Sequence, residues 1–164
     1  DKKTGEMLFQ SKNLWVIMDM IKGRPERPSY IDGRLPYVDP QLRHFDPALP
    51  KFPTEDEYNE GSFDSLKVHP TYYDTDYNRH VNNISYIVWL MESFPHEYLD
   101  HNLPEFFDVE WKKQCHLGDE IRVETKKKEN SEEYYTKILR KCEDGSEEIA
   151  FHGITRWRKR VLDK

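Results

Sequence analysis

Ten residues, 74–83, gather short polar side chains of the kinds that act on a carbonyl group. The stretch reads DTDYNRHVNN and holds two aspartates, three asparagines and one histidine. Hydrolysis of an ester or thioester develops negative charge on the carbonyl oxygen, which N–H donors stabilise. Asp76, Asn78 and His80 alternate in sequence, so on an extended chain their side chains would project to one side. A carboxylate, an amide and an imidazole would then converge on one carbonyl carbon, with a water held between them.

The same residues also suit the start of a helix. Asn82 and Asn83 fit capping or turn duty as well as function, because their side-chain oxygens accept hydrogen bonds from free helix N–H groups. Asp74 is expected to be a structural acceptor, and His80 taken alone would be a hydrogen-bonded structural histidine. If the helix begins here, the N–H groups near Val81–Asn83 and the positive end of the helix dipole form an oxyanion site. No Gly-x-Ser-x-Gly string accompanies the cluster, so an acyl-enzyme serine route has no signature.

The helix that must position this cluster is predicted from apolar residues with helical spacing. Five of them form one stripe: Ile84, Ile87, Val88, Met91 and Phe94. Pro95 is expected to stop the helix. Tyr86, Trp89 and Leu90 lie on the other side of it, so we expect the helix to be buried almost all round.

Strands are predicted on both sides of this helix. Residues 62–74 alternate apolar and polar side chains, and Pro70 confines that strand to an edge or a bulge. Four strand candidates follow the helix: 105–115, 118–128, 132–143 and 147–160. The Asp-Gly pair in CEDGSEE is a hairpin signal between the last two. The predicted class is α+β, with a curved antiparallel sheet wrapped around one long buried helix.

The N-terminal third of the sequence has a different organisation. Strand formers fill residues 7–20, where we expect a strand that KGRPERP closes. Seven of the ten prolines lie between Pro25 and Pro53. Residues 25–61 show no sustained period and are interpreted as an extended linker between two domains. The opening DKKTGEML has no initiator methionine and is expected to be sequence from inside a longer protein.

The composition favours an acidic, soluble protein. The formal net charge of the 164 residues is −6, whereas nucleic-acid binders show a basic surplus. No apolar run approaches the roughly 20 residues that span a bilayer. Cys115 and Cys142 are too few for a disulfide scaffold, lack zinc spacing and favour a reduced cytosolic setting. No nucleotide, metal or cofactor motif is present, so no cofactor is expected.

Three stretches of the sequence, taken together, point to one enzyme family. DTDYNRHVNNISYIVWLMESFP carries a D-x-D-x-N-x-H-V-N-N string, and VEWKKQCHLGDEI places a cysteine before a polar turn. The third stretch is LWVIMDMIKGRPERP. In these features the chain resembles the acyl-ACP thioesterases, which release fatty acids from acyl carrier protein in plants and bacteria. The third stretch resembles the closing strand of that family's N-terminal half.

This resemblance implies two hotdog folds in tandem. Residues 1–24 would be the terminal strands of an incomplete N-terminal hotdog, and residues 25–61 the interdomain linker. Residues 62–164 would form the C-terminal hotdog that carries the catalytic residues. The chain is therefore expected to be a fragment that lacks most of the N-terminal hotdog.

The resemblance also implies roles for the residues at the matching positions. Asp76, Asn78 and His80 are implicated in orienting water or polarising the thioester. Cys115 matches a cysteine proposed as a nucleophile, but we expect a buried strand thiol, because the water route needs no covalent step. Gln114 stands where the plant enzymes usually have glutamate, and an amide cannot act as a base. Our mechanistic expectation is that Asp76 or His80 activates water while Asn78 helps to fix the thioester.

The function implied by the resemblance is hydrolysis of fatty acyl-ACP to free fatty acid. The acidic carrier protein would dock on a basic segment, for which 156–160 and 126–128 are the candidates. The setting would be the cytoplasm of a bacterium or the plastid of a plant, and a homodimer stays open. One alternative is a hotdog acyl-CoA thioesterase with Asp76 as the main base. Another is a non-catalytic acyl-binding or structural hotdog domain, which Gln114 makes plausible.

Overall fold

The chain divides into two compact units, Asp1–Lys51 and Phe52–Lys164. The computed structural model describes residues 1–8, 11, 13, 16–19, 21–27, 52, 54–58, 60–63 and 65–161, with only the backbone of 60–62. Among these residues, no helix has the length and apolar character needed to cross a membrane.

In the first unit, the described residues contain one small hairpin. Strand β1, Met18–Asp19, pairs antiparallel with β2, Arg24–Pro25. Gly23 has a φ of 63°, and its N–H donates to the Asp19 carbonyl at 2.8 Å, which closes the turn. The predicted strand at 7–20 is therefore observed only at Met18–Asp19, and part of that range lies outside the described residues. Most of the predicted linker, namely 28–51, 53 and 59, also lies outside them.

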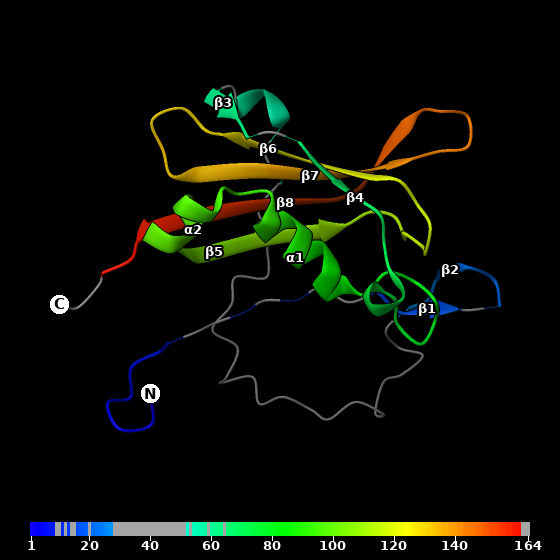
Figure 1. The fold of residues 1–164 in the computed structure, drawn as a ribbon. Helices are drawn as coiled ribbons and strands as arrows, with labels where there is room; N and C mark the ends of the chain where they lie inside the picture. The colour runs from blue at the N-terminus through cyan, green and yellow to red at the C-terminus, as the bar shows by residue number, and fades with distance from the viewer. Residues whose placement is uncertain are drawn as a thin grey trace. The chain divides into compact units, whose positions relative to one another are not determined.

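The second unit is built on one antiparallel sheet (Figure 1). Its strands are β3 Glu60–Ser62, β4 Leu66–Val68, β5 Asn102–Trp111, β6 Ile121–Lys127, β7 Glu133–Lys141 and β8 Glu147–Lys159. The strand order is β3-β6-β7-β8-β5, and β4 also pairs with β6. All four strands predicted after the helix are confirmed, although β5 ends at Trp111 and leaves residues 112–115 outside the ladder. Residues 72–74 of the predicted upstream strand form a one-turn 3-10 helix instead.

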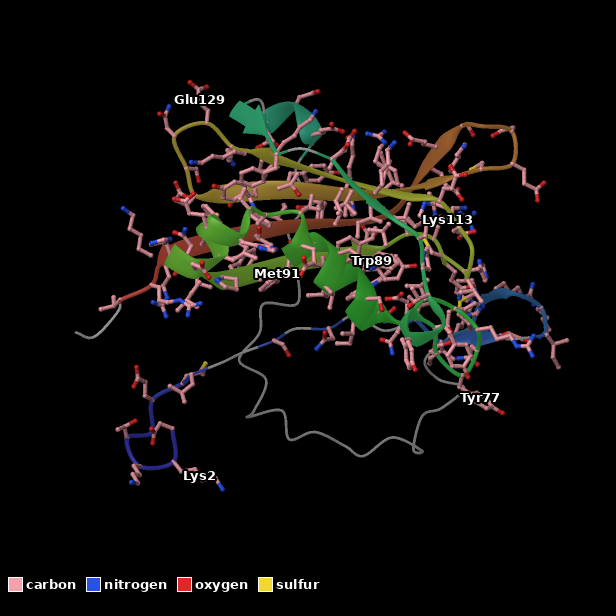
Figure 2. All side chains as sticks on the ribbon, viewed as in Figure 1. Lys2, Tyr77, Trp89, Met91, Lys113 and Glu129 are labelled. Carbon is pink, nitrogen blue, oxygen red and sulfur yellow. The ribbon has the colours of Figure 1, made fainter. Side chains whose placement is uncertain are left out.

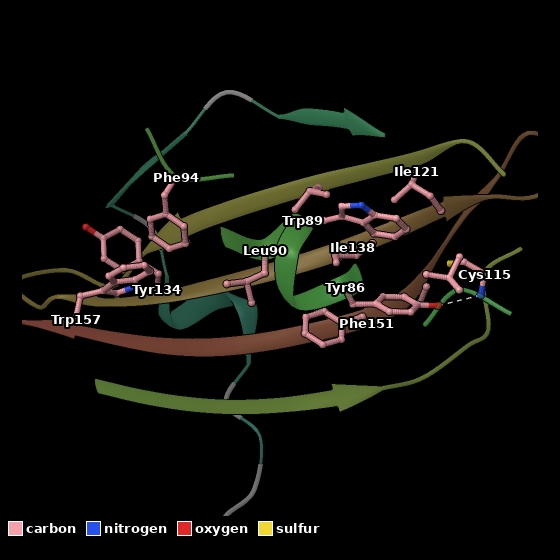
Figure 3. Close-up of a cluster of buried hydrophobic side chains, with 13 residues drawn as sticks. Tyr86, Trp89, Leu90, Phe94, Cys115, Ile121, Tyr134, Ile138, Phe151 and Trp157 are labelled. Carbon is pink, nitrogen blue, oxygen red and sulfur yellow. Dashed lines mark hydrogen bonds between the residues drawn. The ribbon is translucent and has the colours of Figure 1, made fainter. Parts of the chain in front are cut away.

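Helix α1, Asn83–Glu92, crosses one face of this sheet (Figures 1 and 3). A second helix, α2 His96–His101, follows it (Figure 1). Tyr86, Trp89 and Leu90 are buried against the sheet, and Phe94 fills the space beyond the end of α1. The predicted stop at Pro95 separates two helices, because Pro95 is the N-cap of α2.

The predicted burial of α1 on all sides is wrong for this unit. Ile84 is 67% exposed and Val88 is 47% exposed, on the side opposite Tyr86 and Trp89. Both sides of the helix are apolar, so apolar spacing alone could not identify the side that meets the sheet. With 10 residues the helix is also shorter than expected. The sequence pattern therefore predicted the element and missed its orientation.

Close approach and buried hydroxyls fix α1 on the sheet. A Cβ atom built on Gly153 of β8 would lie 3.0 Å from Leu90 Cδ1, so glycine leaves room for the helix there. At the end of α1, the Ser93 hydroxyl donates to the Leu90 carbonyl at 2.7 Å. Ser93 Oγ lies 2.6 Å from Thr125 Oγ1, which lies 2.7 Å from Thr136 Oγ1. This buried chain of hydroxyls connects α1 to β6 and β7.

Phe52 and residues 54–58 cover the opposite face of the sheet. Tyr58 is fully buried beside Tyr135, and the Phe52 ring stacks on His152 with centroids 3.9 Å apart. Glu55 accepts hydrogen bonds from Lys126 and Lys137 at 2.6 and 2.9 Å. Residues 54–58 therefore pack on the same sheet as the strands that follow them.

Candidate active site

The polar cluster at 74–83 folds into a short closed loop. Thr75 and Val81 form an antiparallel bridge, and the Asp76 N–H donates to the His80 carbonyl at 2.8 Å. Arg79 adopts a φ of 63°, a left-handed conformation that residues with a β-carbon rarely take. The chain is a turn here, so the extended geometry considered in the sequence analysis does not relate these side chains.

Asp76 organises this loop through its carboxylate. Oδ1 accepts hydrogen bonds from the N–H groups of Asn78, at 2.8 Å, and of His80, at 3.2 Å. The Arg79 N–H donates to the Asp76 carbonyl at 3.0 Å. Asp76, Asn78 and His80 are thus brought together by backbone contacts to a single carboxylate oxygen.

Asp74 is a structural acceptor, as predicted. It ends the 3-10 helix Tyr72–Asp74, and its Oδ2 accepts from the N–H and the hydroxyl of Thr71, both at 2.7 Å. Burial alone would raise the pKa of Asp74, but the hydrogen bonds from Thr71 outweigh it and hold that pKa below its usual range. The Asp74 carbonyl also accepts from the Asn82 N–H at 2.7 Å, which ties the start of the loop to its end.

The loop lies directly against residues 114–116. His80 and His116 form an antiparallel bridge, and the Val81 N–H donates to the Cys115 carbonyl at 2.8 Å. The two imidazole rings meet edge to face, with centroids 5.2 Å apart and planes at 80°. Two motifs more than thirty residues apart in sequence therefore form one site.

Cys115 contributes backbone contacts to this site and keeps its thiol buried. The residue has no exposed surface, and burial raises the pKa of its thiol. Its N–H donates to the Tyr86 hydroxyl oxygen at 2.9 Å, a contact drawn as a dashed line in Figure 3. Desolvation disfavours the thiolate that a nucleophilic route requires. The expected buried thiol is confirmed, although Cys115 lies beyond the end of β5.

The N-terminus of α1 opens beside the loop. Asn82 is the N-cap, and its side chain accepts from the Ile84 N–H at 2.9 Å, which confirms its predicted capping role. The Val81 and Asn82 N–H groups already donate to protein carbonyls. Of the three N–H groups expected to hold an oxyanion, only that of Asn83, the first residue of α1, has no protein acceptor among the described residues.

Gln114, which directly precedes Cys115, is exposed. Its carbonyl accepts from Arg140 Nη1 at 3.0 Å. Arg140 also pairs with Glu148, and its Nη1 lies 3.8 Å from the Asp119 carboxylate. The arginine that binds the Gln114 carbonyl therefore also pairs with two carboxylates.

Two residues of this site were not identified from the sequence. His116 follows the cysteine directly, and a histidine in a polar turn gave no periodic signal. Tyr86 looked like a core residue, yet its hydroxyl also donates to the Lys113 carbonyl at 3.4 Å. Only the pairing of residues 80 and 116 reveals the histidine, and such long-range pairing is not encoded in local patterns.

The exposed residues around the loop are polar and aromatic. Tyr72, Tyr73 and Tyr77 are all largely exposed, and Figure 2 shows Tyr77 projecting away from the loop. Within the described part of the chain, no group of three or more His, Cys, Asp or Glu side chains could hold a metal ion. A groove of about 690 Å³ lies at the β4–β6 edge, lined by Lys67, His69, Glu120, Ile121, Arg122, Lys141, Gly145 and Glu147.

The two candidate docking segments, 126–128 and 156–160, differ in their ion pairs and in their exposure. Lys126, Lys127 and Lys128 each form an ion pair with a glutamate. In segment 156–160, Trp157 is buried, whereas residues 158–160 are exposed. Trp157 packs on Phe94, so this segment lies at the end of α1 opposite the polar loop.

Comparison with known proteins places this chain in a family. A family model described as the acyl-ACP thioesterase C-terminal domain matches residues 57–159. Oleoyl-acyl carrier protein thioesterase 2, chloroplastic, of Arabidopsis thaliana is 28% identical over 188 aligned residues, covering 98% of this chain and 50% of the relative. Dodecanoyl-[acyl-carrier-protein] hydrolase, chloroplastic, of Cinnamomum camphora is 27% identical, covering 99% of this chain and 43% of the relative. The chain spans about half the length of the curated relatives it matches.

Solved structures agree on the fold. The 12:0-ACP thioesterase of Umbellularia californica superposes with a TM-score of 0.60 at 20% identity, covering 87% of this chain and 53% of that structure. An acyl-ACP thioesterase of Bacteroides thetaiotaomicron gives a TM-score of 0.60 at 19% identity, covering 86% and 53%. These likenesses support the α+β hotdog class predicted from the sequence. The chain belongs to the acyl-ACP thioesterase family and carries its C-terminal domain.

Proposed function

We propose that this chain is the catalytic part of an acyl-ACP thioesterase, in which water hydrolyses the thioester of a fatty acyl-acyl carrier protein. The products are a free fatty acid and the carrier's thiol. The observation that supports this most is the contact between the loop 75–81 and residues 114–116 at the N-terminus of α1. It gathers a carboxylate, an amide and imidazoles in a chain that belongs to this family.

The proposed reaction begins with a water activated by His80 or Asp76. Asp76 Oδ1 holds the loop, while no described residue donates a hydrogen bond to Oδ2, so that oxygen is available to a water. As the water oxygen bonds to the carbonyl carbon, its proton passes to the base and the π electrons move to the carbonyl oxygen. Collapse of this intermediate re-forms the C=O bond, breaks the C–S bond and returns the proton to the sulfur.

The developing oxyanion needs a donor that the protein has not already used. We assign this role to the Asn83 N–H, at the positive end of the α1 dipole. Asn78 supplies a side-chain amide that can hold the thioester. Gln114 can orient a water or a neighbouring group but cannot accept its proton.

The partner follows from the relatives, which are named for acyl carrier protein substrates and for the chloroplast. As part of the proposal, we infer that this chain also acts on acyl carrier protein and that it works in a plastid or in the bacterial cytoplasm. Residues 158–160 are the better docking candidate, because the lysines at 126–128 are already paired. Reversing the charges of Arg158 and Lys159 should raise KM for acyl-ACP and leave kcat unchanged. An unchanged KM would remove this segment from the docking surface.

The deciding experiment measures hydrolysis by purified protein that contains this chain, over acyl-ACPs of graded length. Each acyl-ACP is compared with the acyl-CoA of the same chain length. Faster turnover of acyl-ACP supports the proposal, whereas equal or faster turnover of acyl-CoA favours an acyl-CoA thioesterase. Binding of acyl chains without hydrolysis of either donor would contradict an enzymatic role and indicate an acyl-binding domain.

A further inference from the structure

The imidazole of His116 is a part of the site for which neither the sequence motifs nor the proposed mechanism accounts. His116 and His80 come from separate segments and are paired through the backbone bridge between them. Side chains directly opposite across an antiparallel pair lie on the same face and interact. The ring centroids are 5.2 Å apart at an interplanar angle of 80°, which is edge-to-face contact.

The position of His116 is fixed from its other side as well. Its N–H donates to Asp119 Oδ2 at 2.9 Å, and the Asp119 N–H donates back to the His116 carbonyl at 3.2 Å. This closed turn holds the backbone of His116, while the loop centred on Asp76 holds that of His80. Hydrogen-bonded turns therefore fix the backbone of both histidines at the point where their rings meet.

The reaction supplies a reason for a second imidazole. Thioester hydrolysis needs a group that takes a proton from water and returns it to sulfur. Gln114 cannot do this, which leaves Asp76 and His80. The efficiency of His80 in this step depends on the orientation of its ring and on its charge.

We propose that His116 is a positioning residue that acts through His80. This inference rests on the proposed function. Edge-to-face contact restricts the ring plane of His80, and a neutral His116 leaves His80 free to accept the proton of water. A charged His116 opposes that proton transfer, because like charges at this separation repel. Both rings must therefore be neutral before water attacks.

Other charged groups face this pair and remain in every variant below. Asp76 and Arg79 belong to the loop that carries His80, and Asp119 belongs to the turn that carries His116. Arg140 reaches the Asp119 carboxylate from β7, at 3.8 Å. Because these groups are unchanged, differences between the variants report on the second imidazole.

The first arm of the test needs no substrate. The His80 ring resonances are followed by NMR from pH 4 to 9 in the wild type, His116→Gln and His96→Gln. His96 is an exposed histidine beyond the end of α1 and serves as the matched control. We expect His116→Gln to shift the ring proton signals of His80, because it removes the edge-to-face neighbour, and His96→Gln to leave them as in the wild type. Identical His80 ring signals in all three proteins would overturn the ring contact.

The second arm measures kinetics on acyl-ACP. His116→Gln should lower kcat by about tenfold to a hundredfold, the range that misplacement of a catalytic group produces, with KM nearly unchanged. The acid limb of its kcat/KM profile should have a slope of one, against a slope approaching two in the wild type. If His116→Gln kept full activity while His80→Ala was inactive, the role of His116 would be overturned and the proposed function would stand. A wild-type protein that hydrolyses neither acyl donor would instead overturn the proposed function, and this inference with it.

Discussion

At the scale of single residues, Asp76 combines two tasks that substitutions can separate. Its Oδ1 holds the N–H groups of Asn78 and His80, and its negative charge is what the proposed hydrolysis uses. Asparagine retains an acceptor oxygen in the same place, whereas alanine removes it. The two variants therefore distinguish the geometry of the loop from the chemistry of the carboxylate.

Asp76→Asn is expected to lower kcat for acyl-ACP hydrolysis by about a hundredfold or more, because acid–base catalysis contributes at least that much. The free energy of unfolding should change little. Asp76→Ala should lose the same activity and also about 1 kcal/mol of stability, the usual value of a net hydrogen bond. Steady-state kinetics and urea unfolding measure both. Near-wild-type turnover of Asp76→Asn would exclude the carboxylate from the reaction.

Cys115→Ser is expected to retain a substantial part of the hydrolytic activity. The thiol is fully buried and burial raises its pKa, so it is poorly suited to attack a thioester. The backbone contacts of Cys115 with Tyr86 and Val81 survive the substitution. The measurement is kcat with acyl-ACP, alongside a circular dichroism spectrum. Complete inactivation of a folded variant would revive the covalent thiol mechanism.

At the scale of elements, the local sequence pattern predicted which helices and strands exist better than it predicted the contacts between them. Helix α1 and the four strands after it were found because their apolar spacing and the Asp-Gly turn are local signals. The exposed side of α1, at Ile84 and Val88, was missed because it depends on which face the sheet covers. Helix α2 was missed because Pro95 reads equally as a stop or as an N-cap. The contact of His80 with His116 was missed because it joins distant segments.

The buried hydroxyl chain at the end of α1 makes a prediction about stability. Thr125→Val leaves the buried hydroxyls of Ser93 and Thr136 without this partner. We expect a loss of about 1–3 kcal/mol, the cost of an unsatisfied buried polar group. The triple variant Ser93→Ala, Thr125→Val, Thr136→Val should lie closer to the wild type, because no hydroxyl is then left unpaired. Urea unfolding of both checks this, and a triple variant less stable than Thr125→Val would contradict it.

At the scale of the whole molecule, Glu55 joins distant parts of the second unit. Its carboxylate binds Lys126 and Lys137, so residues 54–58 are held against the sheet. Hydrogen bonds from Lys126 and then Lys137 lower the pKa of Glu55 in the folded protein. Because this pKa is lower in the folded protein, Glu55 stabilises the fold at pH values above its unfolded pKa of about 4.3. This stabilisation is lost as the pH falls through the lower, folded-state pKa.

Glu55→Gln should therefore be less stable than the wild type at pH 7. The difference should shrink as the pH falls below the unfolded pKa of about 4.3, and it should disappear once Glu55 is protonated in the folded protein. Glu129→Gln, at an exposed position of the β6–β7 connection, is the control and should match the wild type throughout. Urea unfolding at a series of pH values measures the difference. A difference between Glu55→Gln and the wild type that did not depend on pH would contradict an electrostatic role for this carboxylate.

The burial of Cys115 also provides a reporter of motion at the site. Its peptide group is held by Tyr86 and Val81, so a thiol reagent can reach the sulfur only when these contacts break. Cys142 is partly exposed and is the only other cysteine, so it labels first and serves as an internal reference. The slow phase of maleimide labelling then gives the opening equilibrium of the site. Its change on adding an acyl ligand would measure ligand binding without any substituted residue.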